Sequence, residues 1–331
     1  MICDYYQDDY FLKEEDFLQR MTGEIEPFMQ ENCIRGDMVS FDQTQIRYYI
    51  LKNPDEKAAI VACHGFCEFF GKFSEILYYL YKAGYSVFFV EHRGHGHSQR
   101  FTEDMDKVHL TGDFHQYVDD LKYFVDHYVI PQSTTGKLYL YAHSMGGAIG
   151  AMFLEKYPEV FERAVLSSPM IEANYAGLPI QLVRCLMGVS KILKWDEKWA
   201  PGQSPFDGSN HFETSCSESK ARYDYVLSCR LKDPFNRTNG GSYAWGAGAV
   251  KSNAYILKNA AKVKIPVLLI QAGRDDLVMP AAQEKFASLS GNTSLIRFEN
   301  SKHEIFNGKD EVVRDYFRKV LEFYDTGYQT R

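Results

Sequence analysis

Leu138-Tyr-Leu-Tyr-Ala-His-Ser144-Met-Gly-Gly147 is the stretch of sequence that decides the fold. An apolar run passes directly into a serine with small neighbours, and a helix-forming segment follows. A strand, a tight turn and a helix in this order hold the serine in a strained backbone conformation at the carboxyl edge of a sheet. Only small residues fit two positions either side of it, where Ala142 and Gly146 stand, with alanine in place of the usual glycine. The stretch predicts a nucleophilic Ser144; the alternative is a serine that only caps a helix.

The chain around this stretch alternates between short apolar runs and segments with helical spacing. Predicted strands cover residues 58–63, 85–90, 138–141, 164–166, 267–271 and 294–298, and predicted helices cover 73–83, 113–129, 148–156, 281–289 and 310–324. A helix around 14–20 and a hairpin of 38–41 with 45–51 are expected before them. Strands separated by long helices need crossover connections, so the sequence predicts an α/β fold with a mainly parallel central sheet flanked by helices.

This alternation stops over residues 169–251, which are rich in Trp, Tyr, Met, Gly and Ser and contain an apolar helical segment at 179–195. It resumes afterwards. The prediction is therefore one α/β core made of residues 1–168 and 252–331, interrupted by a largely helical cap insertion over 169–251 that returns the chain to the same sheet.

A serine nucleophile needs a base, and the base needs an acid that orients it. Two predicted post-strand loops supply them: Ala272-Gly-Arg-Asp-Asp-Leu-Val278 and Asn300-Ser-Lys-His303-Glu304. The carboxyl ends of parallel strands meet at one sheet edge, so Ser144, an aspartate and His303 are predicted to converge there. His303 is the only histidine beyond the aspartate loop.

Asp275 and Asp276 compete for the role of the acid. Asp276 is favoured because it stands three residues after Gly273 and directly before the apolar pair Leu277-Val278. Asp275 is then an ordinary solvated carboxylate.

An oxyanion hole is expected from two backbone N–H groups. Met145 follows the nucleophile at a helix start, where the helix dipole favours negative charge. Phe66 lies in the loop Cys63-His-Gly-Phe-Cys-Glu68 after the first buried strand, and Gly65 allows close approach of the backbone. The alternative is a loop that only packs under the serine turn.

Three further features have structural explanations. The run Glu91-His-Arg-Gly-His-Gly-His97 suggests a metal site, but its glycines and its place after a strand favour a tight turn, and no metal or cofactor is predicted. Cys67 is expected to be an inert thiol, and His143 a structural residue rather than a second base.

Charge and cysteine usage indicate which partners and which cellular compartment to expect for this protein. The formal net charge is −7 and no basic stripe is present, so nucleic-acid binding is not expected. The seven cysteines show no paired spacing and the chain start lacks a basic and apolar signal, which predicts free thiols in a reducing, cytoplasmic setting. No stretch approaches the roughly 20 apolar residues that span a bilayer. Transient contact of the cap with a membrane surface remains open.

The sequence resembles the bacterial lysophospholipase and monoacylglycerol lipase branch of the α/β-hydrolase superfamily, also grouped as Hydrolase_4 or serine aminopeptidase S33-like. The shared motifs are His64-Gly65 with Glu68, Arg93-Gly-His-Gly96 with Ser98, His143-Ser-Met-Gly-Gly147, Gly273-Arg-Asp-Asp276 and Lys302-His-Glu304, with Asp233-Pro234 and Gly240-Gly-Ser-Tyr-Ala-Trp245 in the return from the cap. The resemblance covers residues 35–325 and implies ester hydrolysis on single-chain lipids without a cofactor.

The substrate expected from the cap is an ester with an acyl chain. Apolar residues of 178–193 cover more than one helical face, which indicates an apolar entrance; the alternative is a helix sandwiched between cap and core. Short-chain carboxylesterases and small-peptide aminopeptidases share these motifs, and an aminopeptidase would need acids such as Glu172, Asp196 and Glu197 to hold the substrate amine. A non-catalytic binding module is the alternative from another class.

Overall fold

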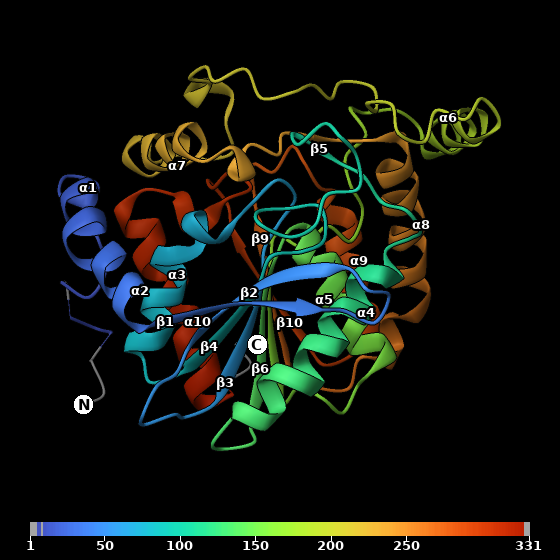
Figure 1. The fold of residues 1–331 in the computed structure, drawn as a ribbon. Coiled ribbons are helices and arrows are strands. Elements are labelled where there is room, and N and C mark those ends of the chain that lie inside the picture. Colours follow the sequence, from blue (N-terminus) through green and yellow to red (C-terminus); the bar gives the residue numbers. More distant parts are fainter. Residues whose placement is uncertain (1–4, 8, 328–331) are drawn as a thin grey trace.

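The computed structural model describes residues 5–7 and 9–327, and within them an eight-stranded sheet forms the centre of the molecule (Figure 1). In spatial order its strands are β1 (Cys33–Val39), β2 (Gln45–Leu51), β4 (Ser86–Val90), β3 (Ala59–Cys63), β6 (Leu138–His143), β7 (Arg163–Ser167), β9 (Val267–Ala272) and β10 (Thr293–Phe298). β2 pairs antiparallel with β1 and β4, and all other pairs are parallel. The predicted mainly parallel sheet is confirmed.

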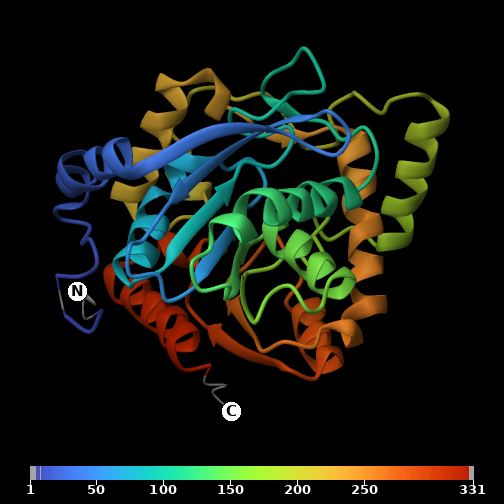
Figure 2. The same ribbon diagram turned by 60° about the horizontal axis from the view of Figure 1, so that its bottom comes forward.

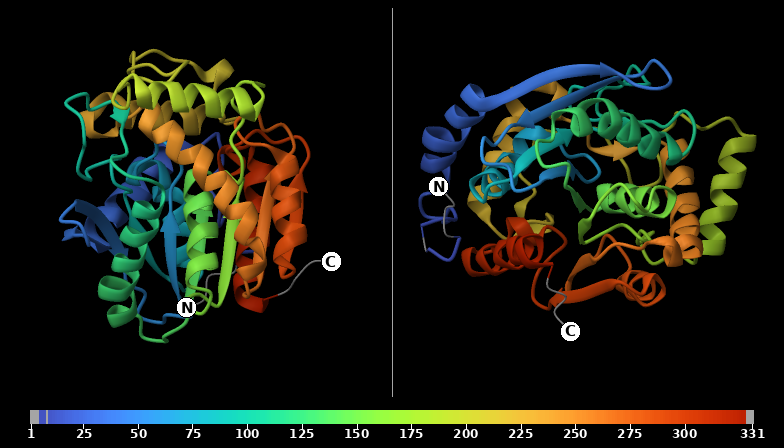
Figure 3. Two further views of the ribbon diagram at one scale, coloured as in Figure 1. Left: turned by 90° about the vertical axis from the view of Figure 1, so that its right-hand side faces the viewer. Right: turned by 90° about the horizontal axis from the view of Figure 1, so that it is seen from below.

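Helices cover both faces of the sheet because its central strands are apolar on both sides (Figures 2 and 3). In β3, Val61 and Cys63 pack into one core while Ile60 and Ala62 pack into the other. The helices α4 (His115–Phe124), α5 (Met145–Lys156), α8 (Tyr243–Asn259) and α9 (Pro280–Ser290) cover the first face, and α3 (Phe70–Lys82) and α10 (Asp310–Thr326) cover the second. Such continuous apolar runs are typical of strands buried between helices.

Two predicted helices continue beyond their regular α-helical part. The N-terminal helix begins at α1 (Phe17–Arg20) and continues through a π-helical turn, η1 (Met21–Ile25), into α2 (Glu26–Asn32). α4 is likewise prolonged by η2 (Val125–Val129) and η3 (Ile130–Gln132). The prediction of no targeting signal falls on residues 1–9, of which 1–4 and 8, and thus Cys3, lie outside the described part of the chain.

Most of the residues predicted to form the insertion run across the top of Figure 1, and their last part enters α8 on its right-hand side. They contain α6 (Ile180–Ile192), η4 (Phe212–Thr214), α7 (Lys220–Lys232), η5 (Pro234–Asn236) and β8 (Gly240–Gly241). β8 pairs with β5 (Lys107–Val108) in a separate two-stranded sheet.

The return from this region is continuous helix. α8 starts at Tyr243 and runs to Asn259, across the predicted boundary at 251/252, and η6 (Ala260–Lys262) leads into β9. β9 then pairs with β7, so the chain does return to the same sheet.

Candidate active site

Ser144 joins β6 to α5 with a positive φ, at φ +52° and ψ −114°. A residue with a Cβ is strained there and persists only where its surroundings hold it. The Ser144 N–H donates to the Ser167 carbonyl at 3.0 Å, and the Ser144 carbonyl accepts from Met170 N at 2.8 Å. The strained turn expected from the sequence is confirmed.

The small residues around Ser144 are explained by close packing. A Cβ on Gly146 would lie 2.5 Å from the Cys63 carbonyl oxygen and 2.6 Å from that of His64. Ala142, by contrast, sits within β6 between Cys63 and Leu166 of the neighbouring strands, where its methyl group is accommodated. Alanine is therefore tolerated at position 142, whereas position 146 requires glycine.

The structure brings Ser144 and His303 together with a carboxylate behind the imidazole. Ser144 Oγ lies 2.8 Å from His303 Nε2, and His303 Nδ1 lies 2.6 Å from Asp275 Oδ2. A carboxylate at Nδ1 fixes the tautomer in which Nδ1 donates, which leaves Nε2 free to accept the serine proton.

The charge of Asp275 also sets the ionisation of His303. Burial alone would lower the pKa of His303, but the hydrogen bond and charge of Asp275, together with the charges of Glu304 and Glu68, outweigh it, and the pKa is raised above its ordinary value. The carboxylate therefore stabilises the positive imidazolium.

The prediction of Asp276 as the partner of His303 is wrong. Asp276 is exposed, and its backbone carbonyl accepts from Asn174 Nδ2 at 2.9 Å. Asp275 Oδ1 accepts from the backbone N–H groups of Leu277 at 2.9 Å and Val278 at 3.1 Å, which turns Oδ2 towards His303.

Two features of the loop that favoured Asp276 in the sequence have other roles in the structure. A Cβ on Gly273 would lie 2.2 Å from the Glu299 carbonyl oxygen, so this glycine allows the ends of β9 and β10 to approach and does not mark the register of the acid. Of the apolar pair, Val278 is buried but Leu277 is 46% exposed, so the two do not anchor the loop together.

The residues expected to supply the oxyanion donors lie at the start of α5 and in the loop after β3, both next to the serine. Met145 is the first residue of α5. The loop containing Phe66 passes beside Ser144, since a Cβ on Gly65 would lie 3.0 Å from Ser144 Cβ. The Phe66 ring stacks on Trp245 of α8 at 3.9 Å between ring centres, which holds this loop against the return helix.

A cluster of buried charges next to the site was missed in the sequence. Lys72 Nζ lies 2.9 Å from Glu68 Oε1 and 2.6 Å from Glu304 Oε1, and the other Glu68 oxygen accepts from Gly65 N. Burial lowers the pKa of Lys72, but the charges of Glu304 and Glu68 outweigh it and raise the pKa. Glu68 precedes α3, Lys72 lies in its first turn and Glu304 follows a distant strand, so no local pattern in the sequence indicated this cluster.

The histidine run after β4, His143 and Cys67 have structural roles. Glu91 accepts from Phe70 N at 2.9 Å and His97 N at 2.7 Å, so the histidine run winds around a buried carboxylate. Burial lowers the pKa of His143 well below its ordinary value, and its Nδ1 lies 3.2 Å from the Ser167 carbonyl. Burial raises the pKa of the Cys67 thiol to about 12, which makes it a poor nucleophile.

Comparison with known proteins places this chain in a family. Lysophospholipase L2 of Escherichia coli strain K12 is 26% identical over 96% of this chain and 95% of its own length. Monoacylglycerol lipase of Mycolicibacterium smegmatis is 25% identical over 78% of this chain and 85% of its own.

Among solved structures, a soluble variant of monoglyceride lipase from Saccharomyces cerevisiae in complex with a substrate analog superposes with a TM-score of 0.70. It is 19% identical and covers 90% of this chain and 96% of its own, which confirms the predicted α/β-hydrolase fold. The family model described as Hydrolase_4, serine aminopeptidase S33, matches residues 54–310, so the chain belongs to this family.

Proposed function

We propose that this protein is a serine hydrolase that cleaves carboxylic esters of single-chain lipids, namely lysophospholipids or monoacylglycerols. The observation that carries the proposal is the hydrogen-bonded relay of Ser144, His303 and Asp275 at the carboxyl edge of the sheet. The names of its relatives, lysophospholipase L2 and monoacylglycerol lipase, support the substrate class.

In the proposed reaction His303 Nε2 accepts the Ser144 proton as Oγ attacks the ester carbonyl. Asp275 holds the imidazole orientation and stabilises its charged form. The N–H groups of Phe66 and Met145 bind the oxyanion, a contribution of about 3 kcal/mol for each such donor. His303 then protonates the leaving alcohol, and water attacks the acyl-enzyme with His303 again as base.

The cap, proposed as residues 169–251, supplies the surface for the acyl chain. α6 turns Val183 towards the protein, where it is 4% exposed, while Leu182 is 54% and Ile192 81% exposed on the outer side. Each acyl methylene buried against apolar side chains on the inner side of the cap contributes about 0.8 kcal/mol. The proposal therefore favours long-chain over acetyl esters.

A hydrolysis panel tests the substrate class. We expect turnover of monoacylglycerols or lysophospholipids to exceed that of short p-nitrophenyl esters and of an aminoacyl-anilide. A preference for the anilide would support an aminopeptidase instead.

A serine-directed label tests the chemistry. A fluorophosphonate should label the wild type, and Ser144→Ala should remove both labelling and turnover while the protein stays folded. A folded wild type that does not react would favour a binding module. Residual turnover of Ser144→Ala above about a thousandth of wild type would refute Ser144 as the nucleophile.

The outer side of α6 supports transient contact of the cap with an anionic lipid surface. Leu182, Val189 and Ile192 are exposed along one side of the helix. Residues 173–195 contain Arg184, Lys191 and Lys194 and no acidic residue, although the whole chain carries a net charge of −7. Exposed apolar side chains among cations match an interface of acyl chains and negative head groups. Among the described residues, no helix is long and apolar enough to span a bilayer.

Vesicle sedimentation tests this contact. The variant with Leu182→Ser, Val189→Ser and Ile192→Ser should lose binding to vesicles of anionic lipid and keep turnover of a water-soluble ester. Leu231→Ser, at a 49% exposed leucine of α7, is the matched control and should bind as wild type. Equal binding of all three proteins would disprove the contact.

The proposed compartment is the reducing cytoplasm. The six cysteines within the described residues are all free thiols, as expected for such a setting.

A further inference from the structure

A short segment of the insertion, residues 215–219, packs against the loop that carries His303. The Asn307 carbonyl accepts from Glu218 N at 3.0 Å, Ser219 N at 2.9 Å and Ser217 Oγ at 3.1 Å. Lys302 Nζ donates to the Ser215 carbonyl at 2.9 Å. The histidine loop is thus bound to the insertion on both sides of His303.

Glu218 reaches from this segment to both loops of the relay. Its Oε1 lies 3.2 Å from Arg274 Nη1, and its Oε2 accepts from the backbone N–H of Lys302 at 3.3 Å. Arg274 directly precedes Asp275, and Lys302 directly precedes His303. A single carboxylate therefore joins the residue before the acid to the residue before the base.

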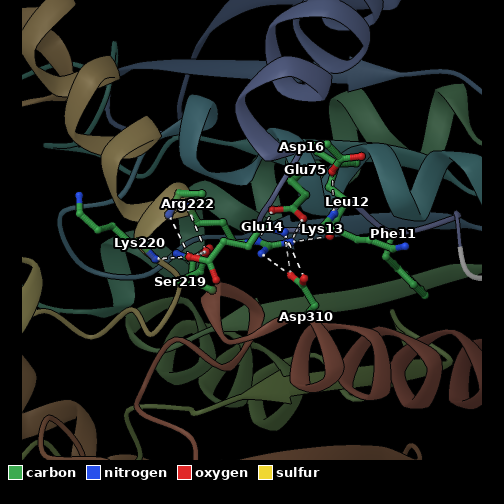
Figure 4. Close-up of polar contacts among 12 residues, drawn as sticks. Phe11, Leu12, Lys13, Glu14, Asp16, Glu75, Ser219, Lys220, Arg222 and Asp310 are labelled. Atoms are coloured by element: carbon green, nitrogen blue, oxygen red, sulfur yellow. Dashed lines mark hydrogen bonds and ion pairs between the residues drawn. The ribbon is translucent and has the colours of Figure 1, made fainter.

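The segment that carries Glu218 is itself fixed to the core at the start of α7 (Figure 4). Glu14 Oε1 accepts from Lys220 N at 2.7 Å and Ala221 N at 3.3 Å. Next along α7, the buried Arg222 pairs with Glu75 of α3, with Nη2 2.8 Å from Glu75 Oε1. The carboxylate of Glu218 is thus presented from a rigid support and not from a free loop.

We infer that Glu218 is a positioning residue, which holds the loops of Asp275 and His303 in register from the insertion side. The inference rests on the proposed function. The two loops come from different strands, and the backbone bond from Arg274 N to the Ser301 carbonyl, 2.9 Å long, links them below the relay. Arg274 Nη1 also donates to the Asn300 carbonyl at 3.3 Å, and Glu218 adds a link between the two loops from the insertion side. Small displacements of reacting groups cost large factors in rate, because the transition state requires their alignment.

The test compares kcat, KM and melting temperature among Glu218 variants. Glu218→Ala should lower kcat on a water-soluble ester about tenfold with KM unchanged, as expected when an interaction needed in the transition state is lost. Glu218→Gln keeps one carbonyl oxygen for Lys302 N and should recover part of kcat. Glu213→Ala removes an exposed carboxylate of the same region and should behave as wild type.

A double variant separates positioning from general destabilisation. If Glu218 acts through Arg274, Glu218→Ala combined with Arg274→Ala should be no slower than the slower single variant. Wild-type kcat in Glu218→Ala would overturn the inference, as would a fall in kcat that appears only near a lowered melting temperature. Failure of the proposed function is distinguishable, because the wild type itself would then neither hydrolyse esters nor take the fluorophosphonate label.

Discussion

At the scale of single residues, Asp275 and Asp276 carry the same carboxylate in different surroundings. The Asp275 side chain is 1% exposed and engages both of its oxygens, one with the loop backbone and one with His303. Asp276 lies exposed on the outer side of the same turn. Successive residues of a turn point in different directions, so one step along the chain separates a relay acid from a solvated one.

Replacing these two aspartates gives a matched pair of variants. Asp275→Asn should lower kcat by up to about 10⁴-fold, the size of loss seen when the orienting acid of such a relay becomes an amide. Asp276→Asn should retain most of the wild-type kcat. Steady-state hydrolysis of a p-nitrophenyl ester measures both, and the reverse order of effects would restore Asp276 as the acid.

The pH dependence follows from the raised pKa of His303. The base must be neutral, so kcat/KM should fall as the pH drops through that pKa, with a midpoint above the ordinary value of 6.5. Asp276→Asn should leave the midpoint in place. A midpoint below 6.5 in the wild type would contradict the pairing of His303 with Asp275.

At the scale of elements, the strand-turn-helix unit around Ser144 depends on the approach of α5 to the end of β3. α5 begins at Met145, three residues before the predicted start at 148. The predicted start is late because Gly146 and Gly147 weaken the helical pattern in the sequence where the helix begins. These glycines are needed for packing, since a Cβ on Gly147 would lie 2.6 Å from Pro169 Cβ.

Adding even one methyl group at Gly146 should therefore lower both the stability of the protein and the reactivity of Ser144. Gly146→Ala places a methyl group against two carbonyl oxygens that belong to backbone, and overpacking of this kind costs about 1–3 kcal/mol. We expect a lower free energy of unfolding in denaturant and a lower rate of fluorophosphonate labelling. The control is Gly188→Ala on α6, where a Cβ meets nothing within 4 Å. Equal effects of the two variants would contradict the packing argument.

At the scale of the whole molecule, the N-terminal segment, the insertion and the core are held together by buried polar contacts (Figure 4). Arg222 of α7 is 1% exposed, donates to both oxygens of Glu75 and also donates to the Leu12 carbonyl at 3.0 Å. Asp310 at the start of α10 accepts from Glu14 N at 2.9 Å. α7 is thereby fixed to the core, whereas the apolar outer side of α6 has no such cover.

Breaking this buried pair should destabilise the protein as a whole. Arg222→Met leaves the Glu75 carboxylate buried without its cation, which typically costs about 3–5 kcal/mol. Arg47→Ala breaks a pair with Asp37 that is partly exposed, with 27% and 55% of the two side chains accessible, and should cost less than about 1 kcal/mol. Denaturant unfolding of the two variants measures the difference. A loss for Arg222→Met no larger than that for Arg47→Ala would show that the buried pair contributes little.

The sequence by itself determined the eight strands of the main sheet in their order along the chain, the serine turn and the loop of the histidine, because these depend on local patterns: apolar runs and small residues around Ser144. It did not predict the helices α7 and α8, where the regular alternation is interrupted. The choice of Asp275, the charged cluster around Lys72 and the contacts of Glu218 were decided only by the tertiary structure. They join residues far apart in the chain, and which carboxylate of a turn faces a distant histidine depends on how the loops after β9 and β10 pack, which no local pattern encodes.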